Sequence, residues 1–321
     1  MADKKIIAVI GSTGSQGGGL ANAILSDPNG GFAVRAITRK TDGDKAKALA
    51  ARGAEIVKAD LDDVESLKKA FAGAYGVYAV TNFWEHFSAE KEKTQAKNIA
   101  DAAKAAGVKH VIWSTLEDTR KLMKSDDKRM PMLQEKYRVP HFDAKADADE
   151  YFKGVPSTCL VTSFYWNNFY TFGLGPKKGA DGKYSWTLPM GNAKMAGIAA
   201  EDIGAAAYGI FKAGPQYIGK TVGIVGENLT VQQMCDKISK VLGIPAIQYN
   251  AVEPDAYRKF GFPGADELGN MFQVYRDFEN AVVAARSEQT TKQLNPKLQS
   301  FEGWLQAHKA EVAKSTEPAP A

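Results

Sequence analysis

The sequence predicts an α/β protein in which a doubly wound parallel sheet is followed by a smaller α+β lobe. Short apolar runs alternate with helical patterns through residue 115, and three closely spaced glycines follow the first apolar run. Strands that alternate with helices form parallel sheets with right-handed crossovers and helices on both faces. After residue 115 the alternation loosens, which indicates a second lobe of different architecture.

The individual elements follow from apolar runs of strand length and from apolar positions at helical spacing. Strands are expected at 6–10, 34–38, 55–58, 75–81, 108–114 and 157–162. Helices are expected at 17–25, 45–52, 64–72, 89–106, 144–152, 231–242 and 254–260. Gly53, Gly73 and Gly107 each directly follow an expected helix, where glycine is a typical stop signal.

These elements divide the chain into two parts. Residues 1–160 form the doubly wound domain and residues 161–314 the smaller lobe, with later segments free to return to the first domain. The charged stretch 116–139 is expected to be a loop or a broken helix. The Pro- and Ala-rich end, 315–321, is expected to be disordered.

Composition narrows the classes of protein. The chain has 321 residues, 41 basic and 37 acidic, and a net charge of +4. That excess fits a phosphate pocket but is far below the basic stripe of a dedicated nucleic-acid binder. No apolar stretch is long enough to cross a bilayer, and the first one has the length of a strand rather than of a signal peptide. Cys159 and Cys235 lie in apolar stretches and are expected to be reduced, which indicates the cytoplasm, with the nucleus as a second compartment.

The turn after the first expected strand is the strongest functional signal. Its residues are Gly11, Ser12, Thr13, Gly14, Ser15, Gln16 and Gly17, and a helix is expected to begin at its end. Glycines at this spacing allow a sharp turn, a close backbone approach to a pyrophosphate and tight helix–strand packing. The helix N-terminus adds amide donors and the positive end of its dipole. The pattern predicts a dinucleotide site on a Rossmann-type sheet; the alternative is a structural glycine turn in a protein that binds no nucleotide.

The residues at the end of the second expected strand indicate which dinucleotide is bound. NAD sites usually place Asp or Glu there to hold the ribose 2′-hydroxyl, whereas this sequence has Arg39 and Lys40. A guanidinium fork and an ammonium match a phosphate, so NADP(H) is the predicted cofactor, with Ser12 and Thr13 as further donors. The alternative is that Arg39 and Lys40 form a solvated strand end. We expect no metal site.

Residues at the ends of the third and fourth strands complete the expected cofactor pocket. Asp60 is the candidate to accept from the adenine amine, with Leu61 beside it. The two carboxylates that follow Leu61 can cap the next helix at the same time. Thr81, Asn82 and Phe83 end the fourth strand, where the chain is expected to pass the cofactor.

The expected active region departs from that of classical short-chain dehydrogenases. Those enzymes use a Tyr-x-x-x-Lys pair, in which the tyrosine transfers the proton and the lysine lowers its pKa. Here Lys145 lies at the head of an expected helix, but His141 stands four residues before it. Histidine can transfer protons near neutral pH, or it can be a packing residue. Ser114 has the position expected for the substrate-holding serine, and Tyr165 and Asn168 are expected to line the nicotinamide end.

Several segments together resemble the NmrA-like proteins, which are atypical short-chain dehydrogenase/reductase members, and in particular their NADP(H) redox-sensor type. The resemblance covers nearly the whole chain and is carried by Gly11–Gly18, Thr38–Arg39, Asp60–Asp63, Val80–Glu85, His141–Lys145 and Gly261–Ala265. It implies that Gly11, Gly14, Gly17, Arg39 and Lys145 contact NADP(H). It also implies a regulator that changes conformation and partner with the NADP(H) state, in a family that borders on quinone and isoflavone reductases.

Two functions are compatible with these residues. The first is a sensor in which NADP(H) orders loops such as 116–139 and changes which protein partner is bound; a homodimer is also open. The second is an NADPH-dependent reductase, an oxidoreductase of a small carbonyl, quinone or imine, in which Lys145 or His141 supplies the proton. No membrane or nucleic-acid partner is expected.

Overall fold

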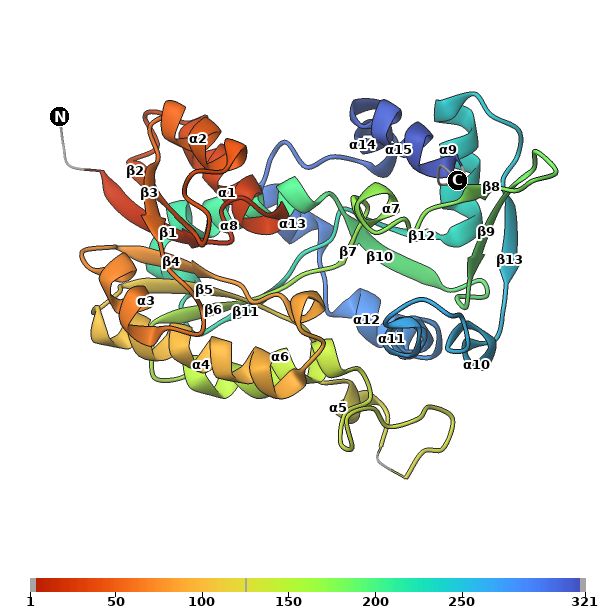
Figure 1. Cartoon of the computed structure of the whole chain (residues 1–321), viewed down its shortest axis with the longest axis horizontal. Coiled ribbons are helices and arrows are strands. Elements are labelled where there is room, and N and C mark those ends of the chain that lie inside the picture. The colour runs from red at the N-terminus through yellow and green to blue at the C-terminus, as the bar shows by residue number, and fades with distance from the viewer. Residues whose placement is uncertain (1–3, 125, 318–321) are drawn as a thin grey trace.

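Seven parallel strands form the central sheet (Figure 1). The structure is a computed structural model and describes residues 4–124 and 126–317. The strands are β1 Lys5–Ile10, β2 Phe32–Thr38, β3 Glu55–Lys58, β4 Gly76–Ala79, β5 His110–Thr115, β6 Ser157–Val161 and β11 Thr221–Gly223. Their order is β11-β6-β5-β4-β1-β2-β3, so the direction of winding reverses between β1 and β4. Ligands of such sheets bind outside the carboxyl ends of the strands at this reversal.

Helices cover both faces of the sheet, as the alternation predicted (Figure 1). One face carries α1 Ser15–Leu25, α2 Asp44–Ala51, α8 Ala200–Ala213 and α13 Glu288–Leu294, and the other carries α3 Val64–Phe71, α4 Ala89–Ala105 and α6 Pro140–Phe152. Alternate residues of β1 serve the two faces. Ile7 and Val9 pack in the core with α1 and α8, whereas Ala8 and Ile10 pack in the core with α3 and α4. The predicted doubly wound parallel fold is confirmed.

The second lobe is built on two small sheets. Their orders are β12-β10-β7 and β13-β9-β8. The strands are β7 Phe164–Tyr165, β8 Lys177–Lys178, β9 Tyr184–Leu188, β10 Lys194–Ile198, β12 Glu227–Thr230 and β13 Gln248–Ala251. The helices are α7 Asn168–Thr171, α9 Val231–Leu242, α10 Pro254–Tyr257, α11 Ala265–Asp277, α12 Glu279–Ala284, α14 Phe301–Ala307 and α15 Lys309–Thr316. Aromatic side chains fill the centre of this lobe, among them Trp166, Phe169, Trp186, Phe301 and Trp304.

Elements that follow residue 161 return to the first domain, among them α8, β11 and α13. β11 extends the large sheet, with Val222 opposite Leu160 of β6. A Cβ on Gly204 of α8 would lie 2.0 Å from the Leu20 backbone nitrogen, so glycine is what lets α8 approach α1 so closely.

Several boundaries differ from expectation, among them those of α1, which begins at Ser15 rather than at 17, and of β2, which begins at Phe32 rather than at 34. α6 begins at Pro140 rather than at 144, because proline suits the first position of a helix. α10 ends at Tyr257, and α15 reaches Thr316, so the first residues of the expected disordered tail are helical. Residues 318–321 of that tail lie outside the described residues. No helix within 4–124 and 126–317 is long and apolar enough to cross a membrane.

Candidate functional site

The glycine turn links the carboxyl end of β1 to the amino end of α1. Gly11 has φ +62°, in the left-handed region that glycine favours, and its carbonyl accepts a 2.8 Å hydrogen bond from the Gly14 amide. A Cβ on Gly17 would lie 2.5 Å from the carbonyl oxygens of Ile10 and Gly11. Gly14 is the N-cap residue and has no side chain with which to bond the first amides of α1. The turn therefore presents backbone amides at a helix N-terminus, an arrangement that binds phosphate groups.

Two polar side chains of the turn are engaged within the protein. The Ser12 hydroxyl donates to the Ile37 carbonyl at 3.1 Å, so its proton is directed at β2. The Gln16 amide accepts from the Tyr78 hydroxyl and donates to the Tyr165 hydroxyl. Gln16 and Tyr165, both expected at the cofactor, are thus brought together beneath the turn.

A cleft of about 460 Å³ adjoins the turn on the side of α2. Thr13 and Ser15 line it together with residues of α1, α2, α7 and the start of α8. Lys45 of α2 also lines it and donates to the Thr13 carbonyl at 3.3 Å. Lys45 is a cation beside the turn that the sequence patterns did not predict, because it lies among other charged residues of an ordinary surface helix.

Arg39 lies directly after β2, as expected, and its guanidinium forms an ion pair with the carboxylate of Glu85. Nη2 lies 3.0 Å from Oε2, and Nη1 bonds Oε1, so the pair is bidentate. The two side chains are 59% and 46% exposed. The hydrogen bonds between them raise the pKa of Arg39 and lower the pKa of Glu85. Lys40 is exposed beside this pair.

The ends of β3 and β4 carry the residues expected near the adenine. The Asp60 carboxylate accepts from the Asp62 amide at 3.0 Å. The cap of α3 is Asp63, which accepts from two amides of its first turn at 3.0 and 3.1 Å. Asp60 is therefore not the residue that caps α3. Leu61 is half-buried and Asn82 is exposed at the end of β4.

Lys145 of α6 is buried in an ionic cluster. Its ammonium donates to Thr81 Oγ1 at 2.8 Å and lies 2.9 Å from Glu92 Oε1. It also lies 4.9 Å from the centre of the Trp113 ring. Burial alone would raise the pKa of Glu92, but the positive charge of Lys145 and the surrounding hydrogen bonds lower it to about 2. The cluster fixes one ammonium at the ends of β4 and β5.

His141, one turn before Lys145, pairs with Glu267 of α11. Its Nδ1 and its backbone amide, the latter at 2.7 Å, both contact Glu267 Oε1. The imidazole centre lies 5.8, 4.8 and 4.6 Å from the ring centres of Phe83, Trp84 and Phe142. Both partners of the pair are buried. The arrangement orients the imidazole strongly and leaves little of it accessible.

Ser114 faces away from the pair formed by His141 and Glu267. Neighbouring residues of a strand point to opposite faces, and Trp113 contacts Lys145. Ser114 instead lies beside Tyr78, where burial raises the pKa of the Tyr78 phenol and the serine hydroxyl lowers it. Asn168 begins α7, half-buried near Tyr165. The structure therefore groups Ser114 with Gln16, Tyr78 and Tyr165, and not with His141.

Glu85, Glu92 and Glu267 were not predicted as site residues. Each is brought to its partner from a distant position in the sequence: Arg39, Lys145 and His141 respectively. The signal that could have found Glu85 is its place in the Val80–Glu85 segment that carried the family resemblance. Glu92 and Glu267 lie in helices with other acidic residues and carry no comparable signal.

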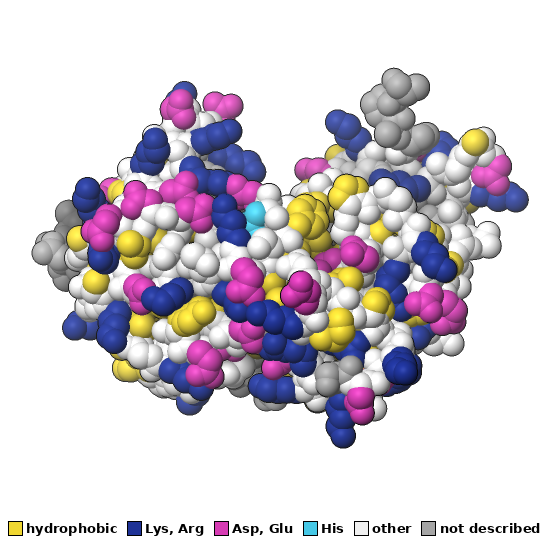
Figure 2. Space-filling view, turned by 60° about the horizontal axis from the view of Figure 1, so that its bottom comes forward, with side chains coloured by type: hydrophobic (Ala, Val, Ile, Leu, Met, Phe, Trp, Pro, Cys, Tyr) yellow, Lys and Arg dark blue, Asp and Glu magenta, His cyan; other side chains and the backbone are white. Residues whose placement is uncertain are grey.

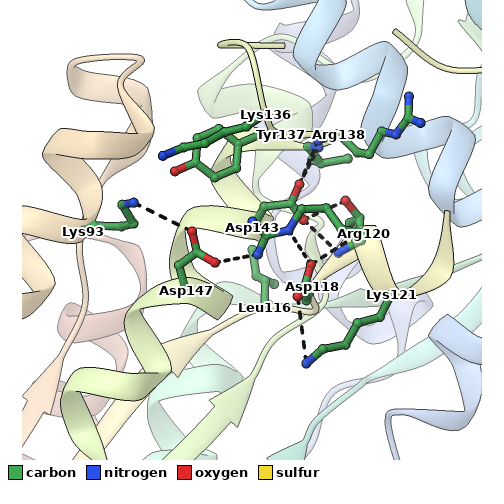
Figure 3. A network of polar contacts seen from close by, with 12 residues as sticks. Lys93, Leu116, Asp118, Arg120, Lys121, Lys136, Tyr137, Arg138, Asp143 and Asp147 are labelled. Atoms are coloured by element: carbon green, nitrogen blue, oxygen red, sulfur yellow. Dashed lines mark hydrogen bonds and ion pairs between the residues drawn. The ribbon is translucent and has the colours of Figure 1, made fainter. Parts of the chain in front are cut away.

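Asp143 anchors both ends of the 116–139 segment (Figure 3). Its buried carboxylate accepts from the amide and hydroxyl of Thr119 at 2.8 and 2.7 Å, and from the amides of Arg138 and Val139 at 2.8 and 3.1 Å. Asn270 of α11 adds bonds to the carbonyls of Pro131 and Arg138. The segment, with α5 (Thr119–Leu122) near its start, is therefore fastened to both lobes.

Asp143→Ala is expected to loosen this segment. Four donors would lose their acceptor, at a cost of about 1–3 kcal/mol in the free energy of unfolding. Limited trypsin digestion should then cut within 116–139 faster than in the wild type. Asp101→Ala is the control, because Asp101 pairs with Lys97 on the exposed side of α4, outside the segment. Equal cutting in both variants would contradict the anchoring role.

Charges are mixed on the face shown in Figure 2, where basic and acidic side chains alternate over both lobes. A nucleic-acid binder is expected to gather basic residues into a patch or stripe. Within the part of the chain that the structure describes, no group of three or more His, Cys, Asp or Glu could hold a metal ion.

Comparison with known proteins places this chain in a family. The model of the NmrA-like family matches residues 3–305. The chain belongs to the NmrA-like family. A curated relative, the NmrA-like family domain-containing oxidoreductase FrzB of a Cladobotryum species, is 29% identical over 286 residues, which cover 83% of this chain and 82% of the relative.

Solved structures with the same fold include the regulator NmrA. NmrA, described as a negative transcriptional regulator in complex with NAD, aligns with a TM-score of 0.78 and 25% identity over 98% of this chain and 97% of its own. The complex of NmrA with NADP aligns with a TM-score of 0.77 and 24% identity over the same shares of both chains. This NmrA-like chain thus has relatives named as oxidoreductases and structural neighbours named as regulators.

Proposed function

We propose that this NmrA-like protein binds NADP(H) at the β1–β4 reversal and acts as a redox sensor rather than as an efficient dehydrogenase. One observation carries the proposal. A glycine turn at a helix N-terminus and a guanidinium at the end of the neighbouring strand β2 are both present, but the residue four before Lys145 is a histidine enclosed by aromatic rings. The side chains expected to bind the cofactor are present, whereas the usual proton donor is replaced by a group with little access.

The residues of the turn fit a dinucleotide. Gly17 lets α1 pack closely on the end of β1, since a Cβ there would lie 2.5 Å from the carbonyl oxygens of Ile10 and Gly11, and the N-cap residue Gly14 leaves the first amides of α1 without a side-chain partner. Arg39 and Lys40 would hold the 2′-phosphate, Asp60 the adenine amine, and Lys145 the nicotinamide ribose. When bound, the cofactor supplies or accepts a hydride. The complexes of NmrA with NAD and with NADP support the binding of a dinucleotide by a protein of this fold.

Arg39→Ala is expected to weaken the binding of NADPH about 10- to 100-fold and to change the affinity for NADH by less than about threefold. The reason is that a charge-assisted hydrogen bond to phosphate is worth on the order of 1.5–3 kcal/mol, and only NADPH has the 2′-phosphate. Fluorescence titration of both cofactors measures the difference. Arg129→Ala is the matched control, because Arg129 also bonds a carboxylate, that of Asp127, and its side chain is 59% exposed like that of Arg39. Equal losses for the two cofactors would refute the 2′-phosphate assignment.

The sensor proposal is tested by hydrogen exchange. NADPH should protect amides in 82–88 and 116–139, since a ligand shifts a protein between two conformations only if it binds them with different affinity. A panel of carbonyls, quinones and imines should show no NADPH oxidation above background. Unchanged exchange at saturating NADPH would count against a sensor.

A second candidate is an NADPH-dependent reductase, favoured by the pairing of His141 with Glu267 and by relatives named as oxidoreductases. In that role the imidazole would donate the proton while the substrate accepts hydride, and Glu267 would hold the ring. Clear turnover in the panel, lost in His141→Gln, would replace the sensor proposal with this one.

We place the protein in the cytoplasm, with the nucleus as a second compartment. Cys159 and Cys235 are free thiols, and burial raises the pKa of both to about 12, which makes them inert. Such thiols suit a reducing compartment. A protein partner, or a homodimer, is the expected receiver of the signal, and size-exclusion chromatography with and without NADPH tests the homodimer.

A further inference from the structure

The carboxylate of Glu85 holds the guanidinium that the proposed function assigns to the 2′-phosphate. Arg39 uses two nitrogens on the two oxygens of Glu85. A phosphate would use the same planar fork. Asp60 and Asp62 act on Arg39 only through space, and they too raise its pKa. Among these acids, Glu85 is the one bonded to the guanidinium.

Glu85 ends a tight turn, residues 83–87, which we call the clasp turn. It begins with the 3₁₀ helix η1, Phe83–Glu85, and closes with a 2.7 Å bond from the Phe87 amide to the Phe83 carbonyl. Phe87 has φ +52°, a backbone conformation that costs free energy for a residue other than glycine, and its ring is 43% exposed. The turn is therefore held in place by its contacts rather than by local preference.

Those contacts reach three other parts of the molecule. Phe83 and Trp84 lie against the His141 ring. Gln134, in the middle of the 116–139 segment, donates to the Phe87 carbonyl at 3.0 Å and accepts from the Ala89 amide at 2.9 Å. The clasp turn thus contacts both His141 and the 116–139 segment.

The same turn also touches the second lobe. Gly264, just before α11, packs so closely that a Cβ there would lie 3.2 Å from the Trp84 ring and 3.3 Å from the Phe87 ring. α11 carries Glu267, the partner of His141. A shift of the clasp turn would therefore change its contacts with His141 in one lobe and with Gly264 in the other.

We propose that Glu85 is an internal competitor for the 2′-phosphate, so that NADP(H), and not NAD(H), releases the clasp turn from Arg39. This inference rests on the proposed function. A phosphate monoester carries more negative charge than a carboxylate and has more acceptor oxygens, so it displaces Glu85 from the fork. Positive charge from Lys91 also reaches Glu85 and lowers its pKa, which stabilises the carboxylate once Arg39 has left.

The test is Glu85→Gln, which keeps the shape of the side chain and removes its charge. NADPH should bind about two- to fivefold more tightly, because an exposed ion pair that the phosphate had to break is gone. NADH affinity should stay unchanged. Glu85 is exposed and the substitution removes no core contact, so circular dichroism should match the wild type.

Asp62→Asn is the matched control, since it removes a negative charge that Arg39 feels but does not touch. It should change NADPH affinity less than Glu85→Gln does. An equal gain in both variants, a gain for NADH as large as for NADPH, or no gain in Glu85→Gln would each overturn the inference. A loss of NADPH affinity in Glu85→Gln would make Glu85 a residue that positions Arg39, which also overturns it.

Fluorescence emission from Trp84 is a second readout, which reports the position of the clasp turn independently of cofactor affinity. The spectrum of Trp84→Phe, subtracted from the wild type, isolates the indole next to Glu85. NADP⁺ should shift this difference spectrum and NAD⁺ should not, and in Glu85→Gln the shift should be present before any cofactor is added. The same spectrum with NADP⁺ and NAD⁺ would contradict release. If the wild type bound neither cofactor, the proposed function itself would be overturned. If the wild type bound NADPH tightly but Glu85→Gln had the same NADPH affinity and the same Trp84 spectrum as the wild type, only the inference about Glu85 would be overturned.

Discussion

Gly17→Ala is expected to weaken NADPH binding about 10- to 100-fold and to lower the free energy of unfolding by about 1–3 kcal/mol. The added Cβ would lie 2.5 Å from the carbonyl oxygens of Ile10 and Gly11, a distance that real Cβ atoms do not show. α1 must therefore move away from β1, which costs packing energy. The same movement carries the first amides of α1 away from the pyrophosphate, and each such bond to a charged group is worth on the order of 1.5–3 kcal/mol.

Gly18→Ala is the control for this prediction. Gly18 is the next residue of α1, and its Cβ would lie 3.3 Å from the Ser12 carbonyl, a contact that a small adjustment relieves. Alanine also gains about 1 kcal/mol over glycine within a helix. Its NADPH affinity should stay within about threefold of the wild type. If Gly17→Ala bound NADPH as well as Gly18→Ala, the turn would not be the phosphate cradle.

Lys145→Met is expected to be among the most destabilising single substitutions in the chain. It leaves the carboxylate of Glu92, which is 0% exposed, without its cation. Removing one partner of a buried ion pair costs about 3–5 kcal/mol. The double variant Lys145→Met, Glu92→Leu should recover much of this loss, because no buried charge is then left unpaired. Urea unfolding measures all three proteins, and a double variant no more stable than Lys145→Met would refute the pairing.

The pH dependence of the Lys145→Met effect has a definite sign. In the folded wild type the pKa of Glu92 is lowered from 4.5 to about 2. A lowered carboxyl pKa stabilises the folded state above pH 4.5, and this contribution is lost as the pH falls toward 2. The stability gap between wild type and Lys145→Met should therefore be largest near neutral pH and shrink below pH 4.5. A gap that stays constant from pH 7 to pH 3 would contradict the charge on Glu92.

Much of the first domain could be predicted from the sequence because its signals are local. The apolar run before Gly11 and the spacing of the three glycines decide both the end of β1 and the start of α1. Gly53, Gly73 and Gly107, all at positive φ, follow helices as expected. The spacing of His141 and Lys145 likewise places them one turn apart on α6, although the helix begins at Pro140.

The partners of the site's charges could not be predicted in this way. Glu267 lies 126 residues from His141, and Glu92 reaches Lys145 only because α4 and α6 cover the same face of the sheet. Ser114 shows the complementary difficulty. Its position at the end of β5 follows from the sequence, but the face of the strand on which it lies is set by Trp113, which packs toward α6 and turns Ser114 toward Tyr78. Tertiary packing, rather than local pattern, decides such pairings.

The NADP(H) site proposed for this chain depends on the glycine turn and Arg39. Fluorescence titration of the wild-type chain with NADPH, and in parallel with NADH, tests it most directly. We expect saturable NADPH binding with an affinity at least about tenfold greater than that for NADH, as the extra phosphate bonds require. Absence of NADPH binding, or equal affinity for the two cofactors, would contradict the account.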